Sequence, residues 1–140
     1  MTEPGVVMRE LVPCGYVLNR TRRQFLATRL TIADGHWTRL RGLIGLGRES
    51  FSSGHALWIL PCRGVHTLGM RFPIDVLYLD RDHVVIHLEA NLPPWRFAPV
   101  RLRAASVLEL PENTLRLTGT TIGDELEIDA PTSGNPSPHA

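Results

Sequence analysis

Short apolar runs separated by turn residues are the dominant pattern of this chain. The runs are rich in Val, Ile, Leu, Phe and Tyr, and most of them end at Gly, Pro or Asp, which is typical of β-strands. The pattern predicts strands at residues 25–32, 56–60, 65–70, 106–110 and 125–128. These segments contain no internal repeat and predict a mainly β domain.

Residues 74–79 and 84–88 form the clearest pair of strands. They flank the polar sequence DRDH at residues 80–83, which suits a tight turn, so we expect a β-hairpin. Both faces of the first arm are apolar, which predicts an inner strand. By contrast, residues 91–99 contain three prolines and should form a loop outside any sheet ladder.

One helix is expected before these strands. Trp37, Leu40, Leu43 and Ile44 follow a helical spacing, and Asp34 precedes them as a possible N-cap. The complete prediction is a compact, antiparallel, partly closed barrel-like sheet of about seven short strands with one short helix.

Length and charge limit the possible organisation and partners. The 140 residues suit one domain, which we place at residues 15–129, after an N-terminal extension (1–14) and before a disordered Pro/Ser/Gly-rich tail (130–140). A net charge of +1 predicts no nucleic-acid partner, and no segment is apolar enough for a membrane span. All basic residues are arginine, which excludes Schiff-base chemistry at lysine. We expect a cytoplasmic location because the first residues do not resemble an export signal.

Asp75 is the first candidate for chemistry. Strand alternation puts it on the same face as Leu77 and Leu79, where a carboxylate is costly unless it is paired. Arg41 and Arg71 are the candidate partners. A structural ion pair is the favoured interpretation, and a poised acid or base is the alternative.

Cys62 and His66 are the second candidate pair. A thiolate beside an imidazole is either a nucleophile pair or half of a metal site, and Met70 would add a soft ligand for transient metal handling. In a straight strand four residues span about 13 Å, so the pair can act together only if Gly64 bends the chain. The chain has no CxxC, HxxxH or HExxH motif, and we expect no cofactor and no metal site.

Four segments resemble, in order and spacing, the family called "domain of unknown function 192". They are RGLIG (41–45), HTLGMRFPIDVLYLD (66–80), VLELP (107–111) and IGDELEI (122–128). The family's motif positions fall on Arg41, Gly42, Met70, Pro73, Asp75, Glu109, Gly123 and Asp124. The resemblance implies a compact β-rich domain without an established activity. His83 stands where the family commonly has glycine, which costs about 1 kcal/mol if the backbone there is left-handed.

Two classes of function remain. The favoured one is a non-catalytic binding or accessory module, in which Arg41, Asp75 and Glu109 form a structural network and residues 93–97 meet a protein, peptide or small molecule. In that case Trp95 should be exposed, whereas a buried Trp95 would indicate a cover for the core. The alternative is an enzyme that uses Asp75 or Glu109 with Cys62 and His66, which requires that these side chains line one pocket.

Overall fold

The computed structural model describes residues 15–33 and 51–130. The expected helix at residues 37–44, Arg41, Gly42, the N-terminal extension and nearly all of the expected tail lie outside this part of the chain. The described elements are β1 (Tyr16–Asn19), β2 (Gln24–Ala27), β3 (Arg29–Ala33), β4 (His55–Ile59), β5 (Ile74–Leu79), β6 (Val85–Leu92), β7 (Ser106–Pro111), α3 (Thr114–Thr118) and β8 (Leu126–Asp129).

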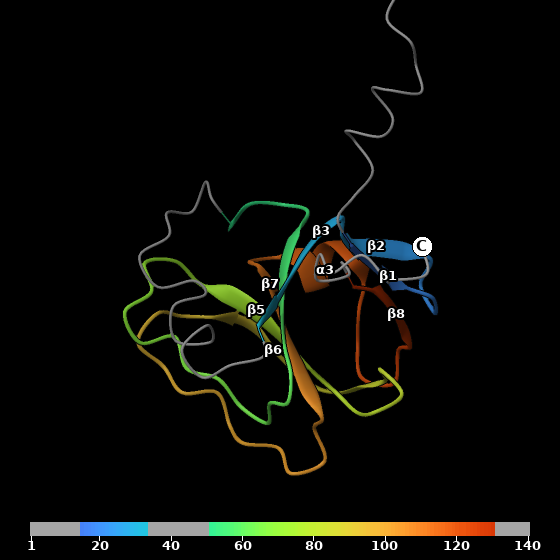
Figure 1. Cartoon of the computed structure of the whole chain (residues 1–140). Helices are drawn as coiled ribbons and strands as arrows, with labels where there is room; N and C mark the ends of the chain where they lie inside the picture. The colour runs from blue at the N-terminus through green and yellow to red at the C-terminus, as the bar shows by residue number, and fades with distance from the viewer. Residues whose placement is uncertain (1–14, 34–50, 131–140) are drawn as a thin grey trace, which may run out of the picture.

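The strands form two sheets, and Figure 1 shows β1, β2 and β8 to the right of β5, β6 and β7. The smaller has the order β2-β1-β8, and the larger has the order β3-β4-β7-β5-β6. The prediction of a mainly β fold with one short helix is confirmed. Two details differ: the described strands divide between two sheets without closing into a barrel, and β3 runs parallel to β4.

The predicted hairpin is present in the larger sheet, where β5 pairs antiparallel with β6. All six residues of β5 are buried between β6 and β7, which confirms the inner strand. In the turn, Asp80 Oδ1 accepts hydrogen bonds from the N–H groups of Asp82 and Val84, both at 2.9 Å. His83 has a φ of 62°, so the left-handed backbone foreseen at this position is present.

The predicted strand at 25–32 is wrong, because the chain leaves one sheet and enters the other within it. β2 ends at Ala27 and β3 begins at Arg29. The N–H groups of Thr28 and Arg29 both donate to Gly54 O, at 2.8 and 2.9 Å, and these bonds fix the crossing point. Hydrophobic alternation runs through the break and therefore does not reveal it.

Two expectations about the segments outside the hairpin are also corrected. The predicted strand at 65–70 contains only an isolated bridge between His66 and Phe97, because Met70 N–H turns back to Thr67 O at 3.1 Å. Residues 91–99 do enter ladders in part, since β6 extends to Leu92 and Phe97 takes part in that bridge. Prolines 93, 94 and 99 lie outside the paired positions.

Residues 61–67 and 93–105 lie along each other, and we call them the loop pair. Backbone hydrogen bonds join them at Thr67 N–H to Arg96 O, Ala98 N–H to Val65 O and Arg101 N–H to Arg63 O, each 2.8 Å. A Cβ on Gly64 would lie 3.3 Å from Val100 Cγ2, so this glycine permits the close approach.

The larger sheet separates two apolar clusters. Val76 and Tyr78 face the first cluster, which the loop pair and its flanks cover with Cys62, Met70 and Ala104. The second cluster lies against the smaller sheet and α3 and is made by Val17, Leu26, Ala27, Leu30, Ala56, Trp58, Leu77, Leu79, Val85, Leu108, Leu110, Leu115 and Leu126. Full burial of each large side chain contributes about 1.5 to 3 kcal/mol, so both faces stabilise the sheet.

Candidate functional site

Asp75 is held by backbone N–H groups from two other elements. Its Oδ1 accepts from Asn91 N–H at 2.7 Å, and its Oδ2 accepts from Leu115 N–H in α3 at 2.8 Å. The residue is 1% exposed. Arg71 is exposed, and no ion pair joins it to Asp75 within residues 15–33 and 51–130. The other expected partner, Arg41, lies outside the described residues, so that pairing stays a prediction.

The protonation of Asp75 reflects this environment. Burial raises the pKa of its carboxyl above the ordinary value, and hydrogen bonds from the N–H groups of Leu115, Asn91 and Asn113 offset part of the rise. The carboxylate joins β5 to the end of β6 and to the first turn of α3. Its observed contacts are those of a structural acceptor.

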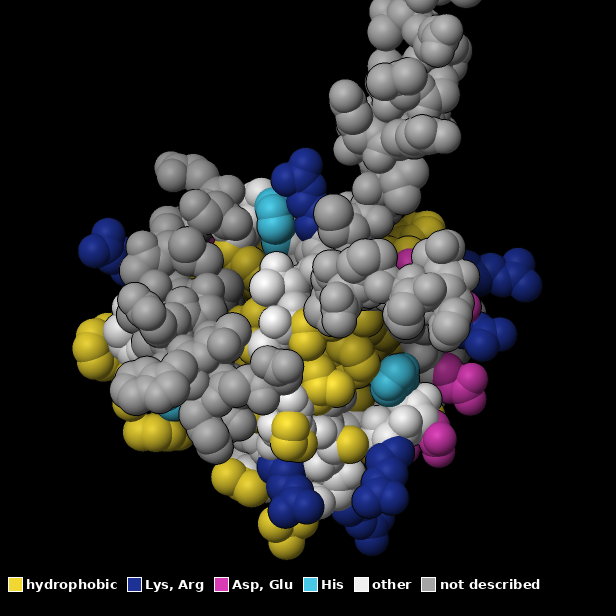
Figure 2. Space-filling model, viewed as in Figure 1, with side chains coloured by type: hydrophobic (Ala, Val, Ile, Leu, Met, Phe, Trp, Pro, Cys, Tyr) yellow, Lys and Arg dark blue, Asp and Glu magenta, His cyan; other side chains and the backbone are white. Residues whose placement is uncertain are grey.

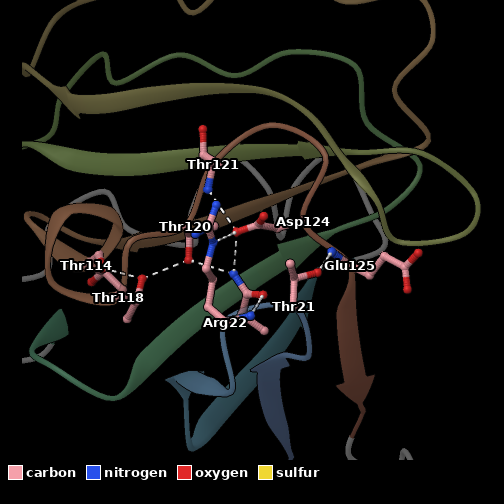
Figure 3. Close-up of polar contacts among 9 residues, drawn as sticks. Thr21, Arg22, Thr114, Thr118, Thr120, Thr121, Asp124 and Glu125 are labelled. Carbon is pink, nitrogen blue, oxygen red and sulfur yellow. Dashed lines mark hydrogen bonds and ion pairs between the residues drawn. The ribbon is translucent and has the colours of Figure 1, made fainter.

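Asp124 makes a second interior anchor, drawn in Figure 3. Its Oδ2 accepts from Asn19 Nδ2 at 2.9 Å, from Arg22 Nε at 3.1 Å and from Thr121 N–H at 3.1 Å. Burial alone would raise the pKa of this carboxyl, but the bonds from Asn19, Thr121 and Arg22 outweigh burial and lower it. The motif position Asp124 therefore fastens the loop before β8 to β1.

Glu109 cannot share a site with Asp75 on one face of the sheet. Glu109 pairs with Val76 across β7 and β5, whereas Asp75 pairs with Leu110. Paired residues point to the same face and neighbours along a strand to opposite faces, so the two carboxylates lie on opposite sides of the larger sheet. Glu109 is 5% exposed and takes part in a polar or electrostatic contact of its own.

Cys62 and His66 have different surroundings. The Cys62 thiol is buried and donates to Gly64 O at 3.0 Å. The His66 ring is tilted against Phe97, with 6.1 Å between ring centroids, and its Nδ1 accepts from Leu68 N–H.

The cavity that Cys62 lines does not contain the other proposed catalytic residues. Its lining residues include neither His66, Asp75 nor Glu109, so this cavity is not the shared pocket that the enzyme alternative requires. Met70, the third ligand suggested for a metal, is buried in the first apolar cluster. No group of three His, Cys, Asp or Glu side chains in residues 15–33 and 51–130 is arranged to hold a metal ion.

Thr67 organises the turn that carries Trp95. The Thr67 hydroxyl donates to Pro93 O at 2.6 Å and accepts from Arg96 N–H at 2.9 Å, while Trp95 N–H donates to Thr67 O at 2.9 Å. Thr67 is fully buried. The motif sequence HTLGM contains it, but a lone threonine gives no signal of contacts about thirty residues ahead, so sequence reasoning missed it.

The turn places two aromatic side chains in solvent. Trp95 has a φ of 63° and is 64% exposed, and Phe97 is 74% exposed. A left-handed bulky residue costs about 1 to 3 kcal/mol and persists only where surrounding contacts enforce it. The exposure of Trp95 agrees with the binding interpretation of residues 93–97 and not with a cover for the core.

Apolar and basic side chains continue along the loop pair. Val100 and Leu102 are 67% and 78% exposed, with Arg101 between them and Arg103 after them. Figure 2 shows yellow and dark blue side chains beside one another along the lower edge, where Figure 1 draws the loop before β7. Two cavities, of about 710 and 570 Å³, flank this loop.

No helix within residues 15–33 and 51–130 is long and apolar enough to cross a membrane.

Comparisons with known proteins agree on one family. The family model DUF192, described as "Uncharacterized ACR", matches residues 17–128. A UPF0127 protein of Thermococcus sibiricus is 30% identical over 129 residues, covering 87% of this chain and 81% of the relative. A UPF0127 protein of Pyrococcus furiosus is 28% identical over 116 residues, covering 79% of this chain and 96% of the relative.

Two crystal structures share the fold. One, from Sinorhizobium meliloti and described as a candidate transcription regulator, has a TM-score of 0.66 at 22% identity and covers 81% of this chain and 91% of its own. The other, a protein of unknown function from Novosphingobium aromaticivorans, has a TM-score of 0.64 at 21% identity, with coverage of 81% and 82%. At these identities the likeness concerns the fold alone.

Proposed function

The chain belongs to the DUF192 family, and we propose that it is a non-catalytic binding module whose contact surface is the turn that carries Trp95 and Phe97. Its ligand is an extended peptide segment of a partner protein. The observation that carries the proposal is the exposure of Trp95 in a left-handed turn fixed from inside by Thr67.

The turn that carries Trp95 costs free energy to maintain. An exposed aromatic side chain on a strained backbone gives nothing to the apolar core, yet three hydrogen bonds hold the turn in place. Rigid aromatic residues bind partners with little further loss of conformational entropy and are enriched at interaction hot spots. Trp95 and Phe97 are two positions apart, a spacing that suits contacts with alternate side chains of an extended peptide.

The interior carboxylates support the non-catalytic part of the proposal. Asp75 and Asp124 are occupied by N–H donors, and Asp75 lies on the opposite face of the sheet from Glu109. A net charge of +1 gives no general attraction for a nucleic acid. The absence of a nucleic-acid partner and a cytoplasmic location stay predictions.

A peptide library displayed on phage tests the proposal directly. We expect selection on the full chain to enrich sequences whose binding falls at least about tenfold in a Trp95→Ala/Phe97→Ala variant. Leu117→Ala is the matched control, because Leu117 is a 73% exposed apolar residue on α3, and binding should be retained in it. A selection that enriches nothing, or sequences that bind the aromatic variant as well as wild type, would overturn the proposal.

A further inference from the structure

The geometry points to a second binding site, an anion pocket formed by Arg63, Arg81 and Arg103. We propose that it takes a small molecule bearing oxyanion groups with two or more negative charges in total, either phosphate or carboxylate. Neither Trp95 nor Phe97 lines this cavity, so the proposal stands or fails independently of the peptide surface.

Three separate loops bring the arginines together. Arg63 follows β4, Arg81 lies in the hairpin turn between β5 and β6, and Arg103 precedes β7. They line one cavity of about 710 Å³, whose remaining walls are Pro61, Cys62, Leu102, Ala104 and Ala105. These arginines are far apart in the sequence, so folding brings them to one cavity. They do not form a local run of basic residues.

The walls of the pocket are fixed by backbone hydrogen bonds. Cys62 N–H donates to Ala105 O at 3.1 Å, and Ala105 N–H donates to Leu79 O at 2.8 Å. Arg101 N–H also donates to Arg63 O at 2.8 Å. A ligand would therefore meet a preformed concave surface and would have to order only the arginine side chains.

All charged side chains that line the pocket are positive. No acidic residue appears in its lining, and none of the three arginines forms an ion pair with a carboxylate in the described ranges. The nearest acidic residues in sequence are Asp80 and Asp82, and Asp80 Oδ1 is already bound by the N–H groups of the hairpin turn. Like charges gathered in a cavity repel one another until an anion binds, and guanidinium groups match the oxygens of phosphate and carboxylate in pairs.

A smaller cavity lies beside the arginine pocket. It has a volume of about 180 Å³, shares Arg81 and Ala105 with the arginine pocket, and is also lined by Trp58, Asp80 and Ser106. Trp58 Nε1 and Ser106 Oγ are buried and have no hydrogen-bond partner among the described residues. Trp58 and Ser106 are therefore polar residues beside the arginine pocket and outside its own lining.

The apolar part of the pocket limits the class of ligand further. Leu102 is 78% exposed and stands with Pro61 and Ala104 at the same cavity. An anion that carries a carbon skeleton would cover this surface, whereas an inorganic ion would not. We therefore expect phenyl phosphate to bind more tightly than inorganic phosphate.

Titration of the full chain with named anions tests the site. Pyrophosphate, citrate, phenyl phosphate and inorganic phosphate are followed by NMR, in buffer of low ionic strength without other multivalent anions. We expect saturable binding of pyrophosphate or citrate, with amide shifts at Arg63, Arg81 and Arg103, and weaker binding as NaCl is raised. Preference for pyrophosphate would identify a phosphate ligand, and preference for citrate would identify a carboxylate ligand.

Arginine variants inside and outside the pocket decide whether the pocket is responsible. Arg63→Ala/Arg81→Ala should lower the affinity at least about tenfold, whereas Arg116→Ala, which removes an exposed arginine on α3, should change it less than about twofold. Unfolding midpoints of all variants check that they fold. No saturable binding of any of the anions, an equal loss in Arg116→Ala, or shifts located away from the loop pair and the hairpin turn would overturn the proposal.

Discussion

The interior and the loop pair of this molecule differ in the surroundings of their polar side chains. Inside, Asp75 and Asp124 each accept hydrogen bonds from several donors and join strands that are distant in sequence. On the loop pair, arginines and aromatic side chains extend into solvent without carboxylate partners among the described residues. The interior carboxylates hold the fold together, and the exposed residues are those that form the two proposed binding sites.

The comparison shows why prominent motif positions need not be functional ones. A buried carboxylate that satisfies three N–H groups is costly to replace, since each donor left without a partner costs about 1 to 3 kcal/mol. An exposed arginine or tryptophan can change without loss of stability, so its role shows only in binding. The following experiments are ordered by the size of the expected effect.

Removal of the Asp75 carboxylate should have the largest effect on stability. Asp75→Ala leaves the N–H groups of Asn91 and Leu115 without an acceptor, and we expect a loss of about 2 to 5 kcal/mol in urea unfolding. Asp75→Asn keeps one carbonyl acceptor and should lose less. An unchanged midpoint for Asp75→Ala would remove the structural role.

Asp124→Ala should follow, with a loss of about 2 to 3 kcal/mol. The variant loses the acceptor for Asn19, Arg22 and Thr121, but Arg22 is partly exposed and can be solvated instead. Hydrogen exchange should show that the protection lost lies first in β1 and β8. Loss confined to the loop pair would contradict this assignment.

Thr67→Val tests the connection between the interior and the exposed turn. We expect a loss of about 1 to 2 kcal/mol, because the hydroxyl contacts with Pro93 and Arg96 disappear while the volume is conserved. Amide exchange at Arg96 should accelerate while exchange in β5 stays slow. Thr118→Val, which alters a partly buried hydroxyl at α3, is the control for exchange in the turn.

The pH dependence of stability should differ in sign between the two carboxylates. The raised pKa of Asp75 means that its contribution is fully present below the ordinary Asp pKa and is lost as the pH rises through the folded value. The lowered pKa of Asp124 means that its contribution is present above the ordinary pKa and is lost as the pH falls through the folded value. Urea unfolding across the acidic range gives the free energy of unfolding of wild type minus that of Asp75→Asn or of Asp124→Asn. Plotted against pH, these two differences should have slopes of opposite sign. Slopes of the same sign would contradict the two environments.

The sequence predicts local pairings well and long-range contacts poorly. Two apolar runs around a polar turn predict the hairpin of β5 and β6. The motif at residues 66–80 identifies the family. By contrast, Asp75 bonds to amides 16 and 40 residues away, and no pattern along the chain indicates which donors arrive there. β1 and α3, which have four and five residues, were not predicted from the sequence. The arginine pocket requires three loops to meet, which only the fold shows.

The most direct test of the difference between the two regions measures binding and stability on the same variant. Trp95→Ala/Phe97→Ala is titrated with a fluorescent peptide selected on the wild-type chain, and its urea midpoint is determined in the same buffer. We predict that affinity falls at least about tenfold while the free energy of unfolding changes by less than about 0.5 kcal/mol. Full affinity in this variant, or a loss of affinity accompanied by unfolding, would contradict the assignment of recognition to the exposed turn.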